Sequence, residues 1–441
     1  MKKYIITFFG LISIFILLLT IVSAFPSSWI KDNVYESAVL LKYEGNRKWT
    51  YVLEKLEKMQ FDNYTDALMI NTAYSIDSKT PTYSAFIARK NYIPGVTKTI
   101  QKDEVGELKS SSKYRGHDEV GELYDTVNGK GEESFEYARY WHGYLTFLRP
   151  LLLVFNLEQI RIFIILICLA LAGVLAYLIN KEINTKSAII VMLGLLGVEY
   201  FIIGLSMQGT PVFLISVIAS ILIIYNYKKI KHIPLVFFII GMLTNFFDFL
   251  TVPMVTWGLP IIIYFMLLQK NENKTLKEQF IIFVKISIAW FLGYILTWLT
   301  KWYLVDIFYG RDLIKVAIGQ IFYRSVGQVE VEGVSALYAI KYNVDYMIIP
   351  LFISLLIIID KGINILCIYH KKHNVELKIS NSIIYLIIAI TPFIWYILLT
   401  NHSCYHAFFT YRNLLLTIIA LPIGIDKLCD TNIKKGAKEL G

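Results

Sequence analysis

Charged residues are scarce in this chain. Asp, Glu, Lys and Arg make up only 17% of its 441 residues, whereas 56% are hydrophobic and the mean hydropathy is +0.54. A soluble globular protein of this length needs a more highly charged surface, so the composition excludes that class. We therefore expect a membrane protein.

Cysteine is also rare. The four cysteines form no CxxC pair, so we expect neither a structural disulfide nor a thiolate metal site. The net charge of +9 comes mostly from Lys and Arg in short segments between apolar runs, a distribution that reflects membrane topology. No nucleic-acid-binding motif accompanies it, and we expect no nucleic-acid partner.

Long apolar runs are the main feature of the sequence. Each approaches the ~20 residues needed to cross ~30 Å of hydrocarbon, which predicts an all-α polytopic membrane protein with about ten transmembrane helices. The runs lie at 5–22, 160–180, 187–206, 211–227, 233–250, 251–269, 280–300, 345–359, 382–400 and 413–427.

The order of these runs predicts the domain organisation. Val22-Ser23-Ala24 resembles a signal-peptide cleavage site, but the preceding run is long enough to be a retained anchor, which we expect. The polar segment that follows is too long for a plain connection and should be a folded extracytoplasmic domain. The expected units are a signal anchor (1–24), a large extracytoplasmic loop domain (25–149), a transmembrane bundle (150–300), an extracytoplasmic loop (301–344), C-terminal transmembrane helices (345–427) and a cytoplasmic tail (428–441).

Lys and Arg in the short loops predict the orientation. Lys181, Lys228, Lys270 and Lys371 fall on one side, together with both termini, so that side should be the cytoplasm of a multi-pass cell-membrane protein. The segment 301–344 breaks the rule, since Lys301, Arg311, Lys315 and Arg324 lie on the translocated side. The presence of these four cations on the translocated side therefore needs a separate explanation.

A hexapeptide, Asp-Glu-Val-Gly-Glu-Leu, occurs at 103–108 and again at 118–123 within the expected outer domain. It lies in a Gly/Ser/Lys-rich stretch, so we interpret it as a mobile acidic loop tip.

Two pairs of carboxylates in the outer domain are candidates for chemistry. Asp32 and Glu36 have i,i+4 spacing, and so do Asp62 and Asp66. On a helix each pair would share one face, and paired carboxylates can push their pKa values apart and serve as a base or a ligand. The alternative is a solvated helix surface.

Polar groups near the expected outer ends of the helices form the second set of candidates. His402, His406 and Arg412 lie in the densest polar stretch, and without an HExxH-like pattern they suggest phosphate or sugar binding rather than a metal site. Glu199 and Asp248 are carboxylates within apolar runs, where they either face a wet cavity or hold helices together. Interfacial snorkelling is the alternative for the His/Arg stretch.

An aromatic and cationic element precedes the second apolar run. It reads Arg139-Tyr140-Trp141-His142-Gly143-Tyr144, followed by Arg149-Pro150. Sugars and lipid headgroups both stack on such rings, so His142 and Arg149 are either ligands or part of an interfacial belt.

This arrangement resembles the GT-C superfamily of membrane glycosyltransferases, which use polyprenyl-phosphate-linked sugars, as the protein mannosyltransferases and aminoarabinose transferases do. The resemblance covers the topology of nearly the whole chain. It rests on a single helix leading into a large outer loop, on early acids in that loop, on the 141–152 segment followed by Arg161, and on the polar break Asp248-Phe249-Leu250-Thr251-Val252-Pro253.

The resemblance implies a reaction. A carboxylate in the outer loop would take the proton from an acceptor hydroxyl, which attacks a sugar held on a lipid phosphate, while cations stabilise the departing phosphate. The donor would be a polyprenyl-phosphate-linked sugar and the acceptor a saccharide or another envelope component, within the lipid bilayer. The expected bases are Asp62, Asp66 and Asp32 in that order, with Glu36, and the expected substrate- and phosphate-binding residues are His142, Arg149, Asp248, Lys301, Arg324, His402, His406 and Arg412.

Three matters stay open at this stage. No cofactor is assigned, although a carboxylate pair could bridge a divalent metal ion. A transporter or flippase for a lipid-linked saccharide would use a similar wet cavity without a base. A non-enzymatic component of envelope assembly would use the outer domain as a docking module.

Overall fold

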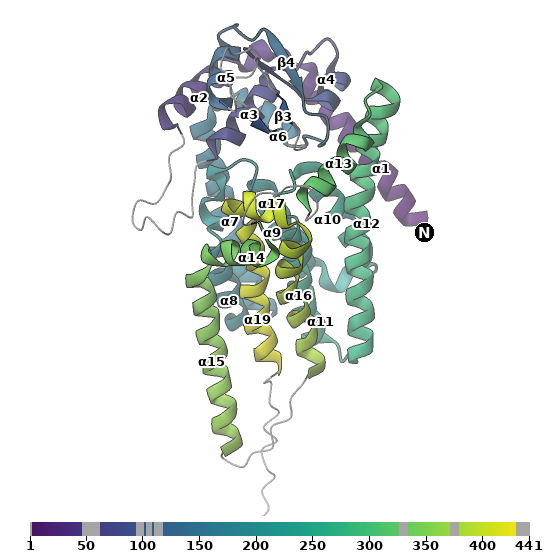
Figure 1. The fold of residues 1–441 in the computed structure, drawn as a ribbon. Helices are drawn as coiled ribbons and strands as arrows, with labels where there is room; N and C mark the ends of the chain where they lie inside the picture. The colour runs from purple at the N-terminus through teal and green to yellow at the C-terminus, as the bar shows by residue number, and fades with distance from the viewer. Residues whose placement is uncertain are drawn as a thin grey trace, which may run out of the picture.

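The protein is mainly helical and consists of a bundle of long helices with a smaller head at one end (Figure 1). The computed structural model describes residues 2–45, 62–93, 101–102, 108–109, 118–325, 334–370 and 379–428.

The head comprises short helices and two small antiparallel sheets. Strand β1 pairs with β4, with Arg89 opposite Glu136, and β2 pairs with β3. Its elements are η1 (Ser27–Ile30), α2 (Lys31–Glu44), α3 (Asn63–Tyr74), α4 (Pro81–Ile87), β1 (Arg89–Tyr92), β2 (Gln101–Lys102), β3 (Leu108–Lys109), α5 (Glu119–Val127) and β4 (Glu133–Glu136).

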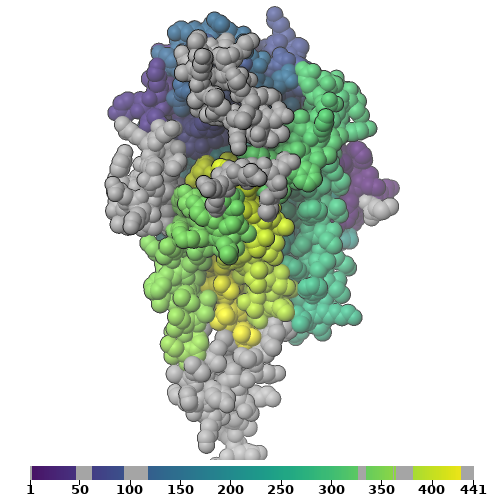
Figure 2. Space-filling view, viewed as in Figure 1, coloured from purple at the N-terminus to yellow at the C-terminus, as the bar shows by residue number. Residues whose placement is uncertain are grey.

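The bundle contains the remaining helices. They are α1 (Lys2–Ala24), α6 (Leu145–Leu152), α7 (Leu157–Glu182), α8 (Thr185–Gly197), η2 (Tyr200–Leu205), α9 (Thr210–Asn226), η3 (Tyr227–Lys229), α10 (Ile233–Phe247), α11 (Met254–Asn271), α12 (Leu276–Tyr309), α13 (Leu313–Arg324), α14 (Ala336–Asp345), α15 (Ile348–His370), α16 (Ile379–Leu398), α17 (Thr400–Tyr405), α18 (Ala407–Thr410), η4 (Tyr411–Leu414) and α19 (Leu415–Leu428). In Figure 2, the green and yellow C-terminal helices form the front of the bundle beside the teal α12.

All ten predicted apolar runs are helical, but not all qualify as membrane spans. Among the described residues, seven helices are long and apolar enough to cross a membrane, or eight if α14 and α15, bent by 84°, make one broken span. Helix α10 has only 15 residues, and α11 does not pass the same test. The protein is therefore an all-α polytopic chain, and the expected count of about ten spans is not confirmed.

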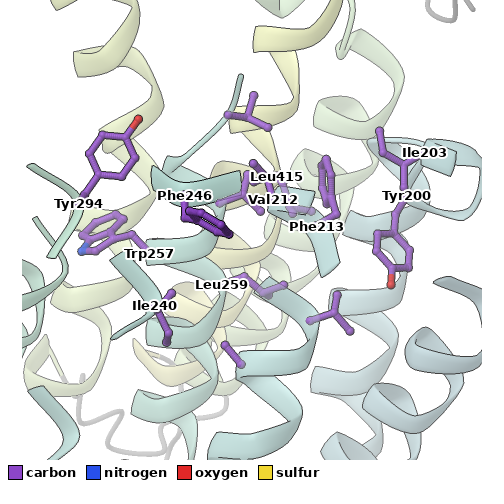
Figure 3. Close-up of a cluster of buried hydrophobic side chains, with 14 of the residues drawn as sticks. Tyr200, Ile203, Val212, Phe213, Ile240, Phe246, Trp257, Leu259, Tyr294 and Leu415 are labelled. Atoms are coloured by element: carbon purple, nitrogen blue, oxygen red, sulfur yellow. The ribbon is translucent and has the colours of Figure 1, made fainter. Parts of the chain in front are cut away.

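Helix α11 lies at the centre of the bundle. Every residue from Val255 to Leu268 is buried, which is expected for a helix that is apolar on all sides and packed against neighbours on all sides. Figure 3 shows Trp257 and Leu259 of this helix among side chains from several other segments, including Phe213, Phe246 and Leu415.

Helices α10 and α12 cross with their backbones in contact. A Cβ atom at Gly241 would collide with the carbonyl oxygen of Trp290, and one at Gly293 would collide with that of Phe238. Because each glycine admits the other helix's backbone, the short α10 is held along its length by α12.

The segment 301–344, expected to be an extracytoplasmic loop, contains helices, because α12 continues to Tyr309 and most of the described remainder forms α13 and α14. One prediction for the head is wrong. The second acidic hexapeptide is not a loop tip, because Asp118 caps α5 and the following residues form that helix. Part of the first copy, 103–107, lies outside the described residues.

A buried charge cluster joins α5 to the sheet of the head. Lys90 on β1 donates hydrogen bonds to Glu119 and, at 2.7 Å, to Glu122, and all three residues are at most 9% exposed. Burial and the neighbouring Glu119 raise the pKa of Glu122 to about 7, although Lys90 opposes the shift. One cation thus faces two carboxylates, and Glu122 carries a proton below neutral pH.

This cluster predicts a pH dependence of stability. The pKa of Glu122 is higher in the folded protein than in the unfolded chain, so folding is favoured below pH ~4.5 and this contribution is lost as the pH rises towards about 7. Thermal unfolding of the protein between pH 5 and pH 7.5 should show the decline, with a slope of at most about 1.4 kcal/mol per pH unit from one proton. The Glu122→Gln variant should flatten the curve, whereas Glu132→Gln on the exposed surface of the head should not. Identical pH profiles for Glu122→Gln and the wild type would contradict the shift.

Candidate functional site

The acidic pair Asp62 and Asp66 lies at the start of α3, where the head meets the bundle. Asp62 is the N-cap residue and accepts a hydrogen bond from the backbone N–H of Thr65 at 3.3 Å. Asp66 follows one helical turn later, so the i,i+4 spacing places both carboxylates on one side of the helix. Asp66 is fully buried, whereas Asp62 is partly exposed.

Asp66 is held by an arginine near the start of α7. Arg161 donates to Asp66 at 3.0 Å, to Asn63 at 2.9 Å and to both oxygens of Glu44 at 2.9 and 3.0 Å. The other oxygen of Asp66 accepts from the backbone N–H of Met207 at 2.9 Å. This charge-assisted network fixes α3 relative to α7 and to the turn before α9.

Asp62 faces that turn. The side chain of Gln208 donates to its carboxylate, and Ser206 Oγ does so at 3.4 Å. Burial raises the pKa of Asp62 above its ordinary value. Burial also raises the pKa of Asp66, to about 7; the charge of Arg161 opposes this second shift and the charge of Asp62 adds to it. Raised pKa values are expected for adjacent carboxylates in a poorly solvated place.

Asp62 lines a cavity together with Arg412. The cavity lies between the start of α3, the segment from η2 to α9, the α10–α11 break and the segment before η4. Its lining residues are Asp62, Ile202, Ile203, Leu205, Ser206, Gln208, Gly209, Thr251, Phe408, Phe409 and Arg412. The space available to the centres of water molecules is about 20 Å³, so the cavity in this conformation admits a water molecule and no sugar.

Arg412 reaches the cavity from the segment before α19. Its guanidinium donates to the carbonyl of Val198 at 3.2 Å and lies 3.5 Å from the carboxylate of Glu199. Tyr411 donates its hydroxyl to the same carboxylate. Glu199 has a backbone φ of 56°, a strained conformation for a residue with a side chain, and its carboxylate offsets the charge of Arg412.

His402 and Arg324 lie beside the same α10–α11 break. Arg324 Nη1 donates to His402 Nδ1 at 2.8 Å, and His402 Nε2 contacts the carbonyl of Leu250 at 2.9 Å. These two contacts together assign the neutral tautomer with the proton on Nε2. Burial, followed by the charges of His406 and Arg324, keeps the pKa of His402 well below its usual range.

Asp248 shapes the break itself. Its carboxylate accepts from the backbone N–H of Thr251 at 3.0 Å and from the hydroxyl of Thr251 at 2.5 Å. Thr251 lines the cavity, and Leu250 has a φ of 64°. Asp248 is therefore a turn-forming residue behind the cavity wall rather than one of its lining residues.

Other predicted site residues lie elsewhere. Asp32 and Glu36 are exposed on α2, where Glu36 accepts from Asn156 at the start of α7 at 2.8 Å. Lys301 is fully buried in α12, donates to the carbonyl of Phe86 at 2.7 Å and lies over the rings of Phe86 and Trp141. None of the three contributes to the cavity, so the acid–cation grouping expected for Asp32, Glu36 and Lys301 is not found.

His142 and Arg149 have structural surroundings as well. His142 is buried, packs against the rings of Tyr137 and Phe249, and has its Nε2 2.5 Å from the carbonyl of Tyr137. Burial and the charge of Lys301 lower its pKa to about 3. Arg149 is fully buried and donates hydrogen bonds to backbone carbonyls. His406 stacks on the ring of Phe409, and Phe409 lines the cavity.

Two residues of the site were not identified from the sequence. Arg161 stood out only as an Arg at a helix start, and its pairing with Asp66 spans 95 positions. Gln208 is an uncharged residue in a tight turn, and no pattern in the sequence links it to Asp62. Among the described residues, no group of three or more His, Cys, Asp and Glu side chains is arranged to hold a metal ion.

Comparison with known proteins identified no relative. The chain matches no protein-family model, no curated protein and no solved structure.

Proposed function

We propose that this protein is a membrane glycosyltransferase that moves a sugar from a polyprenyl-phosphate donor to a hydroxyl of an envelope acceptor. The single observation that supports it most is that Asp62 and Arg412 line one cavity, although 350 positions of sequence separate them. A carboxylate with a raised pKa and a cation in one cavity are the two groups that such a transfer needs.

Asp62 acts as the general base in this proposal. It takes the proton of the acceptor hydroxyl as the hydroxyl oxygen bonds to the anomeric carbon, and the bond from that carbon to the phosphate oxygen breaks. The phosphate leaves with the electron pair and is stabilised by Arg412. Asp66, anchored by Arg161, lies behind Asp62 and positions α3, so it is a positioning residue.

Access to the site needs a change of conformation. The cavity is too small for a sugar, and the side chains of Gln208, Phe408 and Phe409 form part of its wall. Their displacement would open the space between Asp62 and Arg412, and closure around the donor would then exclude water from the reaction. On this proposal the head faces the extracytoplasmic side, because the acceptor belongs to the envelope.

The pH dependence of the reaction tests the proposal. The full chain, reconstituted in nanodiscs, is given a polyprenyl phosphate carrying a radiolabelled sugar and a mixture of envelope saccharides, and release of the sugar-free lipid phosphate is measured. Because protonated Asp62 cannot accept a proton, the rate should fall on the acid side by about tenfold per pH unit. The midpoint of this acid limb should lie above the ordinary pKa of an Asp side chain, because burial raises the pKa of Asp62.

The control is Asp32→Asn, which changes an exposed carboxylate on α2 and should leave both rate and pH profile unchanged. In sealed proteoliposomes, movement of the labelled donor across the bilayer without release of lipid phosphate would contradict the proposal and favour a flippase. A flat rate between pH 4.5 and pH 8 would contradict the assignment of a carboxylate base.

A further inference from the structure

The turn that precedes α9 contacts the acidic pair through three successive residues. Ser206 Oγ donates to the carboxylate of Asp62 at 3.4 Å, and the side-chain amide of Gln208 donates to the same carboxylate oxygen. Between these two residues, the backbone N–H of Met207 donates to Asp66 at 2.9 Å. One short turn of the bundle is therefore in contact with both carboxylates of α3.

The amide of Gln208 covers the oxygen of Asp62 that is available for chemistry. The other oxygen accepts the capping hydrogen bond from the backbone N–H of Thr65 at the start of α3. A carboxylate oxygen has about two lone-pair sites, and Ser206 and Gln208 occupy both sites on the remaining oxygen. The bond from Ser206 is long for a hydroxyl donor, so Gln208 is the main cover. A hydroxyl that is to be deprotonated by Asp62 must therefore take the place of this amide.

The backbone of the turn is fixed, whereas the side chain of Gln208 is free to rotate. The Thr210 hydroxyl lies within hydrogen-bonding distance of the carbonyls of Ile203 and Ser206, at 3.2 and 2.9 Å. A Cβ atom at Gly209 would come within 3.0 Å of the Ile203 side chain, so the turn is also tightly packed. Together with the backbone bond to Asp66, these contacts leave rotation about the side-chain bonds of Gln208 as the way to uncover Asp62.

A water molecule and a saccharide differ in how well they replace this amide. Water can bind Asp62, but the displaced Gln208 then loses its partner inside a cavity that is only partly solvated, which is unfavourable. A saccharide carries hydroxyls on adjacent carbons. One can bind Asp62 while its neighbour binds the displaced amide, which has both donor and acceptor atoms. A diol therefore compensates for the displacement of Gln208, whereas a single hydroxyl does not.

We propose that Gln208 is a specificity-determining residue, which covers Asp62 until an acceptor with two adjacent hydroxyls displaces it. The proposal rests on the proposed function, since it takes Asp62 as the general base. In the resting position, Gln208 keeps Asp62 from activating water, so a bound donor is preserved until the acceptor arrives. The cover over Asp62 can itself be measured without any sugar transfer.

Loss of the cover opens a side reaction, the hydrolysis of the donor. The oxygen of water bonds to the anomeric carbon and its proton passes to Asp62. The bond from that carbon to the phosphate oxygen breaks, and the electron pair leaves with the phosphate. The products are the free sugar and the lipid phosphate. The cavity admits a water molecule even in this conformation.

Two variants test the cover by this side reaction. Gln208→Ala removes the side chain, and Gln208→Met keeps its approximate length but cannot donate. In nanodiscs without acceptor, both should release free labelled sugar from the donor about tenfold faster than the wild type, the effect expected when one hydrogen bond to a charged group is lost. The matched control is Gln159→Met, the same exchange at an exposed position of α7, which should leave hydrolysis unchanged. Wild-type hydrolysis in Gln208→Met would overturn the proposal.

Two small alcohols test the need for adjacent hydroxyls. Wild-type protein should transfer the labelled sugar to ethylene glycol about tenfold faster than to ethanol, because only the diol can bind Asp62 and the displaced amide together. Gln208→Met should bring the two rates close to each other, since no amide remains to be satisfied. A merely structural role of Gln208 would slow both alcohols alike. Equal rates for the two alcohols in the wild type would contradict the proposal.

A chemical probe separates this proposal from the proposed function. A carbodiimide modifies accessible carboxyl groups, and the modified peptides are identified by mass spectrometry. Modification of Asp62 should be faster in Gln208→Ala than in the wild type. If it is faster but no sugar is released or transferred, the glycosyltransferase proposal fails and the cover over Asp62 stands. If transfer proceeds while Gln208→Ala changes neither modification nor hydrolysis, the cover fails and the glycosyltransferase proposal stands.

Discussion

Replacing Asp62 with Asn should reduce the rate of sugar transfer by about 10²- to 10⁴-fold, the usual contribution of a general base. The amide has nearly the same shape, and its oxygen can still accept the capping hydrogen bond from Thr65. Its nitrogen replaces the oxygen that accepts from Gln208 and Ser206, so these two side chains must turn to accept from it instead. What it loses is the ability to take a proton. The expected signature is a low kcat with donor binding retained, measured in the reconstituted transfer assay.

Asp66→Asn provides the comparison. Asp66 is fully buried and bonded to Arg161, so it does not touch the cavity, and its substitution should have a smaller effect on kcat. The charge of Asp62 raises the pKa of Asp66, whereas the pKa of Asp62 itself is raised by burial, so the acid limb of the pH profile should keep its position in this variant. Full activity in Asp62→Asn, or a greater loss in Asp66→Asn than in Asp62→Asn, would remove Asp62 as the base.

Replacing Arg149 with Met should lower the free energy of unfolding by about 3–5 kcal/mol, since each buried carbonyl left without a donor costs about 1–3 kcal/mol. Arg149 donates to the carbonyls of Val22 and Phe25, both at 2.7 Å, and to that of Ala73, and so joins the ends of α1 and α3. Burial lowers its pKa to about 10, which still leaves it charged at neutral pH. The partial negative charge at the two helix ends offsets that positive charge.

Arg311→Met is the matched control for Arg149→Met. Arg311 makes a two-pronged contact with Glu136 at 2.9 and 3.0 Å, but its side chain is 43% exposed, so the loss should stay within about 1 kcal/mol. Unfolding followed by tryptophan fluorescence in detergent would compare the two variants. Equal midpoints for Arg149→Met and Arg311→Met would show that the buried contacts of Arg149 do not hold the head to α1.

Hydropathy was sufficient to locate the helices of the bundle, because an apolar run of this length must satisfy its backbone hydrogen bonds internally. It could not tell a lipid-facing helix from a central one. The run at 251–269 was expected to cross the membrane like its neighbours, yet it forms α11, in which every residue from Val255 to Leu268 is buried by other segments. The distinction depends on packing partners far away in sequence.

The site was only partly predictable for the same reason. The i,i+4 spacing of Asp62 and Asp66 is a local property, so the sequence sufficed to select them, and their helical arrangement is confirmed. Lys301 and Arg149 are cationic side chains like Arg412, yet they bind backbone carbonyls within the protein. Only tertiary structure separates a cation that lines the cavity from one that joins two helices.

The close backbone approach of α10 and α12 at Gly241 and Gly293 has a consequence for biosynthesis. A helix of 15 residues, such as α10, spans only about 22 Å, short of the hydrocarbon thickness of ~30 Å, and is a poor membrane anchor by itself. Its stabilising partner α12 leaves the ribosome some tens of residues later, which at 5–20 residues per second means a delay of roughly seconds. During that interval α10 should remain accessible to insertion factors and to proteases, and a bulky residue at either glycine should prolong this exposure.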